Sequence, residues 1–344
     1  MNSREAQILT YIKEHGETKT VDIHAALDGV SLPTVKRDLA KLVQEGLIAP
    51  LGKGRGTRYA LTDAYLLICP VDLDLYYQKE VDERSVNRNF NWDLIREVLP
   101  VTPLLSASEA DHLNDLQNQF LQRSAELSPA AYRKEMERLA IDLSWKSSQI
   151  EGNTYSLLET ERLLKEKLTA AGKTKEEAIM LLNHKDAIDF LIENEDFMKP
   201  VTVSAIEMIH SLLVKELDVD RNIRTRRVGI SGTNYQPLDN EFQIKEALEA
   251  MCVLVSDREE VFEQALLGLL LISYIQPFMD GNKRTARIVS NAILMRGGRC
   301  PISFRTVDSI DYKKAMLLFY EQNNISRFKQ IFIDQFEFAV NTYF

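Results

Sequence analysis

An apolar segment followed by a charged loop is the feature that most constrains the fold of this chain. Residues 262–275 are almost entirely apolar, and the run is too short to span a bilayer, so it predicts a buried core helix. Beyond the loop, Ala286, Val289 and Ile293 recur on one helical face, and a Gly-Gly pair ends the pattern. The sequence therefore predicts two core helices joined by a short loop.

The loop and the start of the second helix, residues 276–287, have the composition of a phosphate site. Unpaired N–H groups and the helix dipole attract anions at such a position. Gly281 permits close approach of the backbone, and Arg284 and Arg287 lie one turn apart on the same face. Asp280 could hold a hard cation such as Mg²⁺, which binds through one or two carboxylates together with phosphates. Spacing alone predicts a nucleotide-phosphate site, and the alternative is a solvated helix start with incidental arginines.

Composition limits the class of protein further. The chain has 344 residues, enough for two or three domains, and its net charge of −9 argues against a nucleic-acid scaffold held by bulk positive charge. Cys69, Cys252 and Cys300 are too far apart for a disulfide framework or a zinc motif, which indicates a reducing compartment. The first ten residues are polar, without a signal-peptide core. We therefore expect a cytoplasmic protein with no membrane association.

Residues 1–62 have the pattern of a winged helix-turn-helix domain. We expect three amphipathic helices, the third between Ser31 and Gly46, then a strand, a glycine-rich wing and a returning strand. Residues 1–61 hold nine Lys or Arg against seven Asp or Glu. The third helix would enter the major groove of duplex DNA while the wing contacts phosphate, all within residues 31–58. The candidate DNA-binding residues are Lys36, Arg37, Lys41, Arg55 and Arg58. The alternative is a protein-interaction or dimerisation module.

The pattern of residues 63–344 predicts a connector followed by a helical domain. Residues 63–105 are expected to pack on the core, with a strand near residues 65–70. From Ser106 to residue 344 the pattern is nearly all helical, except for a short strand expected at 301–306 and a β-hairpin at 224–237. His184 and His210 lie within helical patterns and are interpreted as structural.

A carboxylate near one helix end needs a partner. The helix predicted to end near residue 153 carries Ser147 and Glu151 on one face. A negative charge is unfavourable at a helix C-terminus unless a cation meets it. We infer that Glu151 pairs with an arginine, and the alternative is an exposed glutamate.

Residues 276–287, Gln-Pro-Phe-Met-Asp-Gly-Asn-Lys-Arg-Thr-Ala-Arg, resemble the signature loop of Fic-domain proteins. Every key position matches except the first, where Gln276 occupies the place of the family's catalytic histidine. Lys283 occupies a position that is glycine in the commonest form of the loop, and this variant resembles the Doc branch of the family. The resemblance implies AMP transfer from ATP to a Ser, Thr or Tyr hydroxyl of a target protein. It also implies that Asp280 holds Mg²⁺ and that Phe278 anchors the loop. The implied phosphate contacts are Gly281, Asn282, Lys283, Arg284 and Arg287.

Two further segments resemble parts of the same family. Residues 147–153 are similar to the Fic inhibitory motif, and Ser147, Glu151 and Gly152 match it. The resemblance implies that Glu151 pairs with Arg287 and blocks productive placement of the γ-phosphate. The expected hairpin resembles the Fic flap, which docks a target segment as an added strand. Its docking residues would be Gly229, Ile230, Ser231, Gly232 and Tyr235, and the hydroxyls of Ser231 and Tyr235 could be modified in cis.

Gln276 weakens the expectation of turnover. A carboxamide is not a general base at neutral pH, and loss of a general base typically costs about 10²–10⁴-fold in rate. Three explanations stay open: an engineered change of a natural histidine, a natural pseudoenzyme that binds nucleotide, or another base such as Glu151 or water. The fold expected is mainly α: a helical Fic domain (106–344) with a small β-hairpin flap, preceded by a winged helix-turn-helix domain. The function expected is an autoinhibited adenylyltransferase that forms a homo-oligomer. The alternative is a nucleotide-sensing DNA-binding regulator with a degenerate Fic domain.

Overall fold

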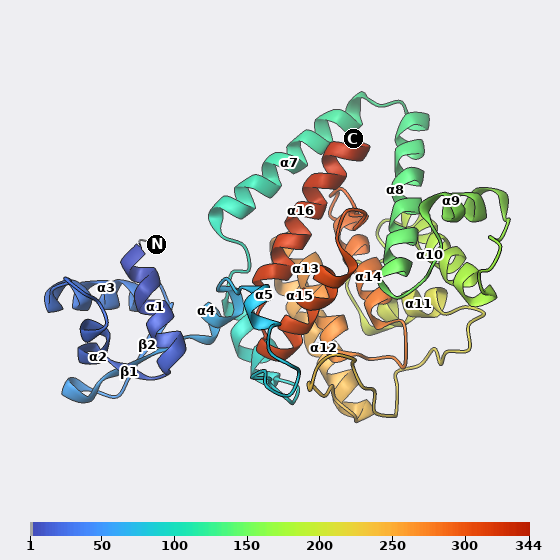
Figure 1. Cartoon of the computed structure of the whole chain (residues 1–344). Coiled ribbons are helices and arrows are strands. Elements are labelled where there is room, and N and C mark those ends of the chain that lie inside the picture. The colour runs from blue at the N-terminus through green and yellow to red at the C-terminus, as the bar shows by residue number, and fades with distance from the viewer. Residues whose placement is uncertain (1–2) are drawn as a thin grey trace. The chain divides into compact units, whose positions relative to one another are not determined.

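The chain divides after Pro70 into two units (Figure 1). The computed structural model describes residues 3–344, apart from the side chain of Arg55. Within these residues no helix is long and apolar enough to cross a membrane. The mainly α class expected from the sequence is confirmed, and the described strands form one small sheet in the first unit.

The first unit contains three core helices, a three-stranded antiparallel sheet of order β1-β3-β2 and a short fourth helix. Its elements are α1 (Ser3–His15), β1 (Thr18–Lys19), α2 (Thr20–Ala25), α3 (Leu32–Gln44), β2 (Ile48–Leu51), a 3-10 turn (Gly54–Gly56), β3 (Arg58–Leu61) and α4 (Asp63–Ile68). Apolar residues of the three helices and of β2 form its core, among them Ile8, Leu39, Leu42 and Ile48. The helices and the strands flanking the glycine-rich segment lie where the sequence placed them.

The strand expected near residues 65–70 is wrong, because this segment begins as helix α4. The side chain of Thr62 accepts a hydrogen bond from the backbone N–H of Tyr65, which caps the helix start. Leu67 is then buried on one side of the short helix. A local cap therefore overrides the β propensity of this apolar run.

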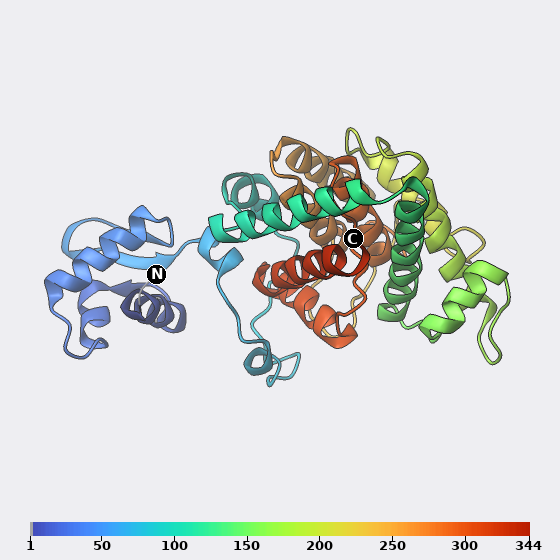
Figure 2. The ribbon, with the colours of Figure 1, turned by 90° about the horizontal axis from the view of Figure 1, so that it is seen from above.

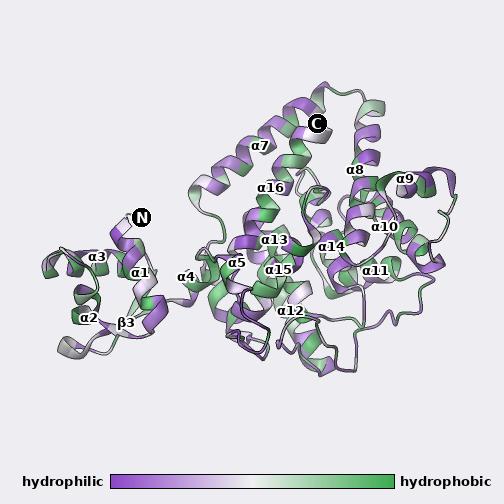
Figure 3. Ribbon diagram, in the orientation of Figure 1, coloured by the Kyte–Doolittle hydropathy of each residue, from purple (hydrophilic) through white to green (hydrophobic). Residues whose placement is uncertain are grey.

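All regular elements of the second unit are helices, and they pack around α13. Its elements are α5 (Leu73–Tyr76), a π-helical turn (Leu94–Val98), α6 (Leu99–Val101), α7 (Ala107–Glu126), α8 (Pro129–Ile150), α9 (Leu157–Glu166), α10 (Lys175–Glu193), α11 (Val203–Leu213), α12 (Glu241–Asp257), α13 (Val261–Ile275), α14 (Asn282–Arg296), α15 (Ser309–Gln322) and α16 (Ser326–Tyr343). α7 lies beside α16 (Figure 2) and carries many hydrophilic residues (Figure 3).

α13 is the predicted core helix, and every residue from Phe262 to Ile275 is buried. It packs against α12, α14 and α15. A Cβ added at Gly268 would lie 3.0 Å from Cδ1 of Ile293 on α14, so the glycine permits the close approach of the two helices. This pair of helices holds the connecting loop in a fixed place.

Residues 71–105 pack on the helical core, whereas residues 63–70 of the expected connector belong to the first unit. The hydroxyl of Tyr76 donates to Oε2 of Glu321 at 2.7 Å, and that of Tyr77 donates to the carbonyl of Lys314 at 2.7 Å. These bonds join the segment to α15.

The two other expected β elements are also wrong. Residues 224–237 contain no strand, and Gln236 forms an isolated parallel bridge with Asn89. Residues 301–306 also have no strand, because the side chain of Asn291 satisfies the backbone of Ile302: Oδ1 accepts from its N–H at 2.7 Å and Nδ2 donates to its carbonyl at 3.0 Å. Side chains supply the hydrogen bonds that neighbouring strands would otherwise provide.

Candidate functional site

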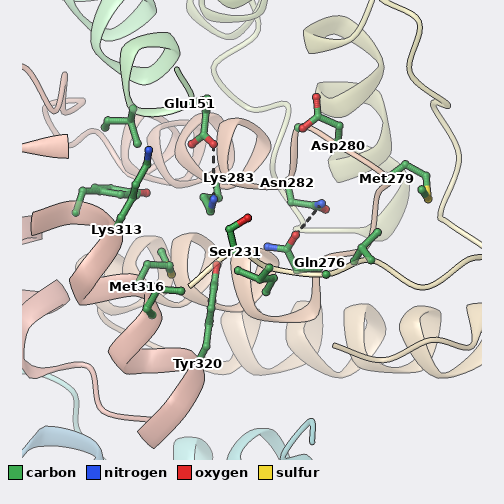
Figure 4. Close-up of a pocket in the computed structure, with 17 residues that line it drawn as sticks. Glu151, Ser231, Gln276, Met279, Asp280, Asn282, Lys283, Lys313, Met316 and Tyr320 are labelled. Atoms are coloured by element: carbon green, nitrogen blue, oxygen red, sulfur yellow. Dashed lines mark hydrogen bonds and ion pairs between the residues drawn. The ribbon is translucent and has the colours of Figure 1, made fainter. Parts of the chain in front are cut away.

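The loop between α13 and α14 is folded by its own side chains. α13 ends at Ile275 and is capped by Gln276, which has φ 52°, while Gly281, at φ 81°, precedes the first residue of α14. Asn282 accepts a hydrogen bond from the N–H of Phe278 at 2.8 Å and donates to the Phe278 carbonyl at 2.7 Å. Its Nδ2 also donates to Oε1 of Gln276 at 3.1 Å (Figure 4). The Asn282 side chain therefore holds the loop itself.

His210 of α11 packs against the loop. Its ring stacks on buried Phe278, with 3.6 Å between centroids, and its Nε2 lies 3.0 Å from the carbonyl oxygen of Asp280. Burial lowers the pKa of His210, so the neutral ring donates from Nε2 to that carbonyl. Phe278 is the anchor expected from the sequence, and the structural role expected for His210 is confirmed.

Arg287 lies at the centre of a buried network that joins α14 to α8. Its Nη2 donates to Oε1 of Glu151 at 2.8 Å, and its Nε donates to Oγ of Ser147 at 2.8 Å. The arginine inferred from the helix-end carboxylate is therefore present. Gly152, at φ 102°, follows Glu151 and ends the helix.

His184 of α10 completes this network. Oγ of Ser147 lies 2.7 Å from Nε2 of His184, and the ring is fully buried. Burial, and then the charges of Arg284 and Arg287, hold the pKa of His184 well below its ordinary value. The neutral ring can accept the proton of Ser147, while the serine oxygen accepts from Arg287. The interpretation of His184 as structural is consistent with this contact, which no sequence spacing indicates.

The second oxygen of Glu151 faces another cation. Nζ of Lys283 lies 3.7 Å from Oε2 (Figure 4). Burial raises the pKa of Glu151, but the charges of Arg287 and Lys283 outweigh it, and the pKa lies below its ordinary value. The carboxylate is therefore ionised at neutral pH and neutralises two groups that could otherwise face an anion.

Two buried guanidinium nitrogens at the start of α14 have no protein acceptor among the described residues. They are Nη1 of Arg284 and Nη1 of Arg287. Arg284 is 2% exposed, and its Nη2 donates to Oδ2 of Asp280 at 2.8 Å. Buried charged donors without a partner are unfavourable. Both arginines therefore retain hydrogen-bonding capacity for an anionic ligand.

A cavity of about 390 Å³ opens over the loop (Figure 4). The loop contributes Gln276 and residues 279–283, the end of α8 contributes Ile150 and Glu151, and the expected flap contributes residues 228–231. The helix α15, which the sequence did not link to the site, contributes a fourth wall. Its lining residues are Tyr312, Lys313, Met316, Leu317 and Tyr320.

The flap residues divide between the cavity and the core. Gly229, Ile230 and Ser231 line the cavity, while Gly232 adopts φ 85° in the adjoining turn. Tyr235 is buried, and its hydroxyl donates to the carbonyl of Tyr274 at 3.0 Å. The expectation that Tyr235 serves as a docking or modified residue is therefore wrong, because its hydroxyl faces the core.

Arg224 ties the flap to the loop and was missed as a site residue. It is buried, its Nε donates to the carbonyl of Gln276 at 2.6 Å, and its Nη1 donates to that of Arg226 at 2.8 Å. Its Nη2 donates to the carbonyl of Leu238. This side chain crosslinks the backbone of residues 224–238 in place of a hairpin ladder.

The candidate DNA-binding residues differ in their exposure and in how close a carboxylate lies to them. Lys41 lies 2.7 Å from Glu5 and 3.6 Å from Glu45, and Arg58 lies 3.7 Å from Glu17. Lys36 and Arg37 are exposed; the Arg37 side chain is 75% exposed, and its Nε lies 3.9 Å from Oδ1 of Asp38. The side chain of Arg55 lies outside the described part of the chain. The exposed basic surface of α3 is therefore centred on residues 36 and 37.

The chain matches two known families over separate regions. Residues 200–294 match the Fic/DOC family, and residues 3–62 match the C-terminal domain of DIP2311-like transcriptional regulators. A "Protein adenylyltransferase Fic" from Nematostella vectensis is 29% identical over 182 residues, which cover 49% of this chain and 40% of the relative. A "Protein adenylyltransferase fic-1" from Caenorhabditis elegans is 27% identical over 214 residues, which cover 58% of this chain and 41% of the relative.

Solved structures agree with the family match at the level of fold. A structure of Fic-1 from C. elegans superposes with a TM-score of 0.59 at 23% identity, over 70% of this chain and 73% of that one. The chain spans about two-fifths of the length of the curated relatives named above. The second unit therefore contains a Fic/DOC domain. In the sequence this domain follows one that is related to transcriptional regulators.

Proposed function

We propose that the Fic/DOC domain binds ATP in the cavity over the loop and descends from protein adenylyltransferases, with Glu151 as its inhibitor. The observation that carries this proposal is the ion pair between fully buried Arg287 and Glu151, which lines the cavity. Arg287 is fully buried and its remaining Nη1 lacks a protein acceptor, so a phosphate oxygen would compete with the carboxylate for it. The chain is then autoinhibited by direct competition for one arginine.

The loop fits a nucleotide with its magnesium ion. Asp280 is the one carboxylate of the loop, its side chain is 66% exposed at the cavity, and one of its oxygens accepts from Arg284. One carboxylate together with substrate phosphates is a usual arrangement for Mg²⁺, which would offset phosphate charge. Lys283 and Arg284 would contact phosphate oxygens, and Gly281 would let the N-terminus of α14 approach them.

Turnover would be slow, because Gln276 cannot accept the proton of the target hydroxyl. Its amide is committed to the fold: Nε2 donates to the carbonyl of Ser273 at 2.6 Å and Oε1 accepts from Asn282. Ser147, held by His184, would keep Arg287 in position in both the inhibited and the nucleotide-bound state. The target would be a protein hydroxyl presented along residues 228–231, whose backbone forms no sheet.

Calorimetric titration with ATP and Mg²⁺ tests this proposal. Replacing Glu151 with Gly is expected to tighten ATP binding about tenfold or more, because Arg287 loses its competing carboxylate. Glu151→Gln, which keeps the size of the side chain but removes its charge, should tighten binding to a similar degree. Equal affinity in wild type and both variants would show that the carboxylate does not compete with nucleotide.

A second candidate function is a nucleotide-sensing regulator that binds duplex DNA through the first unit. It is favoured by the match of residues 3–62 to a transcriptional-regulator domain and by the exposed Lys36 and Arg37 on α3. We expect DNA binding to weaken steeply with salt. Arg37→Ala should weaken binding about five- to tenfold, whereas Lys41→Ala should have a smaller effect, since Lys41 is already paired with Glu5. Fluorescence anisotropy with a labelled duplex, with and without ATP, measures both. Equal losses in the two variants, or none in either, would argue against this use of α3.

A further inference from the structure

The wall of the cavity supplied by α15 has no assigned role. The helix begins at Ser309, beyond the region 200–294 that matches the Fic/DOC family. Its face toward the cavity includes Tyr312 and Tyr320, both fully buried, and neither hydroxyl has a hydrogen-bond partner among the described residues. Buried hydroxyls of native proteins are usually paired, so this wall presents hydrogen-bonding groups that the folded chain does not use.

Tyr320 is the better placed of the two for a bound ligand. Its oxygen points into the cavity from below Ser231 (Figure 4). Gln276 and Ser273 are the polar neighbours that act on this hydroxyl, but neither has the geometry of a hydrogen bond to it. The donors of Gln276 and Asn282 are already committed within the loop. The Tyr320 hydroxyl is therefore an uncommitted donor beside the position where the reacting groups would meet.

The ring of Tyr320 is held rigidly, which fixes the position of its hydroxyl. It stacks on Tyr235 with 5.6 Å between centroids and lies 6.2 Å from Tyr274. Burial raises the pKa of Tyr320 well above its ordinary value, so the group is a donor and not a base at neutral pH. A fixed donor without a partner suits an anionic oxygen, since charge-assisted hydrogen bonds are the strong ones.

We propose that the Tyr320 hydroxyl donates a hydrogen bond to a phosphate oxygen of the nucleotide bound beside Gln276. This inference rests on the proposed ATP site and adds to it a contact from a helix outside the matched family region. Tyr320 is then a ligand-binding residue, and α15 is part of the nucleotide site as well as of the core.

The test compares Tyr320→Phe with Tyr235→Phe, both in a Glu151→Gly background that leaves Arg287 available. Calorimetric titrations with ATP and with inorganic tripolyphosphate, each with Mg²⁺, should show about tenfold weaker binding of both probes by Tyr320→Phe. Its melting temperature should be unchanged or higher, because the variant removes an unpaired buried hydroxyl. Tyr235→Phe should bind both probes normally but melt lower, because it loses a buried hydrogen bond to Tyr274.

The outcomes separate this inference from the proposed function. If the parent binds ATP, and Arg287→Ala weakens binding while Tyr320→Phe does not, the inference is wrong and the nucleotide site stands. If Tyr320→Phe weakens ATP binding but not tripolyphosphate binding, the contact is not to phosphate and the inference is also overturned. If the parent binds neither probe, the proposed function fails, and the assignment of Tyr320 fails with it.

Discussion

Introducing a histidine at position 276 together with removal of the Glu151 carboxylate is expected to produce a measurable protein adenylyltransferase. In the Glu151→Gly background, Gln276→His should raise the rate of AMP transfer by about 10²–10⁴-fold, the usual effect of a positioned general base. Gln276 lines the cavity at the end of α13, so a histidine there would reach the reacting groups. Glu151→Gly alone should free Arg287 but leave the base missing, and Gln276→His alone should remain inhibited.

Transfer of label from α-labelled ATP to the protein itself and to proteins of a cell lysate measures all four forms. The matched control is Gln276→Ala with Glu151→Gly, which opens the same space without a base and should stay at background. Asp280→Ala in the active double variant should abolish labelling if this carboxylate holds the magnesium ion. Absence of labelling in the histidine-containing double variant, with ATP bound, would contradict the assignment of the loop to AMP transfer.

Local signals account for most of what the sequence could predict of the fold. Capping boxes form at the starts of three helices, where Ser106, Ser156 and Thr174 pair with a glutamate three residues later, a spacing that is visible in the sequence. The uniformly apolar run that becomes α13 identified the core helix, because its composition leaves no solvated face. Caps and apolar periodicity depend on residues within one or two turns, and these are readable from a single sequence.

The two strands and the hairpin expected outside the first sheet are absent for a shared reason. Short β-prone segments form strands only where neighbouring backbone is available to pair with them. Here a nearby cap from Thr62 converts one segment to helix, while Arg224 and Asn291 bind backbone carbonyls of Arg226 and Ile302 in the other two. In these two segments side chains satisfy backbone groups, and no propensity scale includes such contacts.

The site residues also divide into those that the sequence could predict and those that it could not. That Glu151 pairs with an arginine was inferable because a carboxylate at a helix C-terminus needs a cation, and the resemblance to the Fic inhibitory motif identified Arg287 as that arginine. His184, Arg224 and Tyr320 could not be found, because each reaches the site from a separate helix or loop. Tyr312 and Tyr320 lie on one helix, α15, and nothing in the sequence indicated what that helix would contact.

Replacing Arg287 with Ala is expected to be the most destabilising of these changes. Its loss would leave Glu151 and Ser147 without their shared donor, and breaking a buried ion pair by removing one partner typically costs about 3–5 kcal/mol. Urea denaturation followed by circular dichroism, in the transition of the second unit, measures the free energy of unfolding. Arg287→Lys, which retains the charge but not the fork of donors that contacts both Ser147 and Glu151, should lie between wild type and Ala.

A double-mutant cycle separates the ion pair from the packing of the Arg287 side chain. Glu151→Gln should lower the free energy of unfolding less than Arg287→Ala does. Adding Glu151→Gln to Arg287→Ala should recover part of the lost stability, because the double variant no longer buries an unpaired charge and retains only the cavity left by the arginine. Without Arg287 the effect of burial on Glu151 is less opposed, so its pKa should rise relative to wild type. The stability difference between wild type and Arg287→Ala should then be larger at about pH 7 than at about pH 4.5, where the variant protonates this carboxyl on folding. A difference that does not change with pH, with no recovery in the double variant, would mean that Arg287 stabilises the fold by packing alone, and Glu151 would then not be its electrostatic partner.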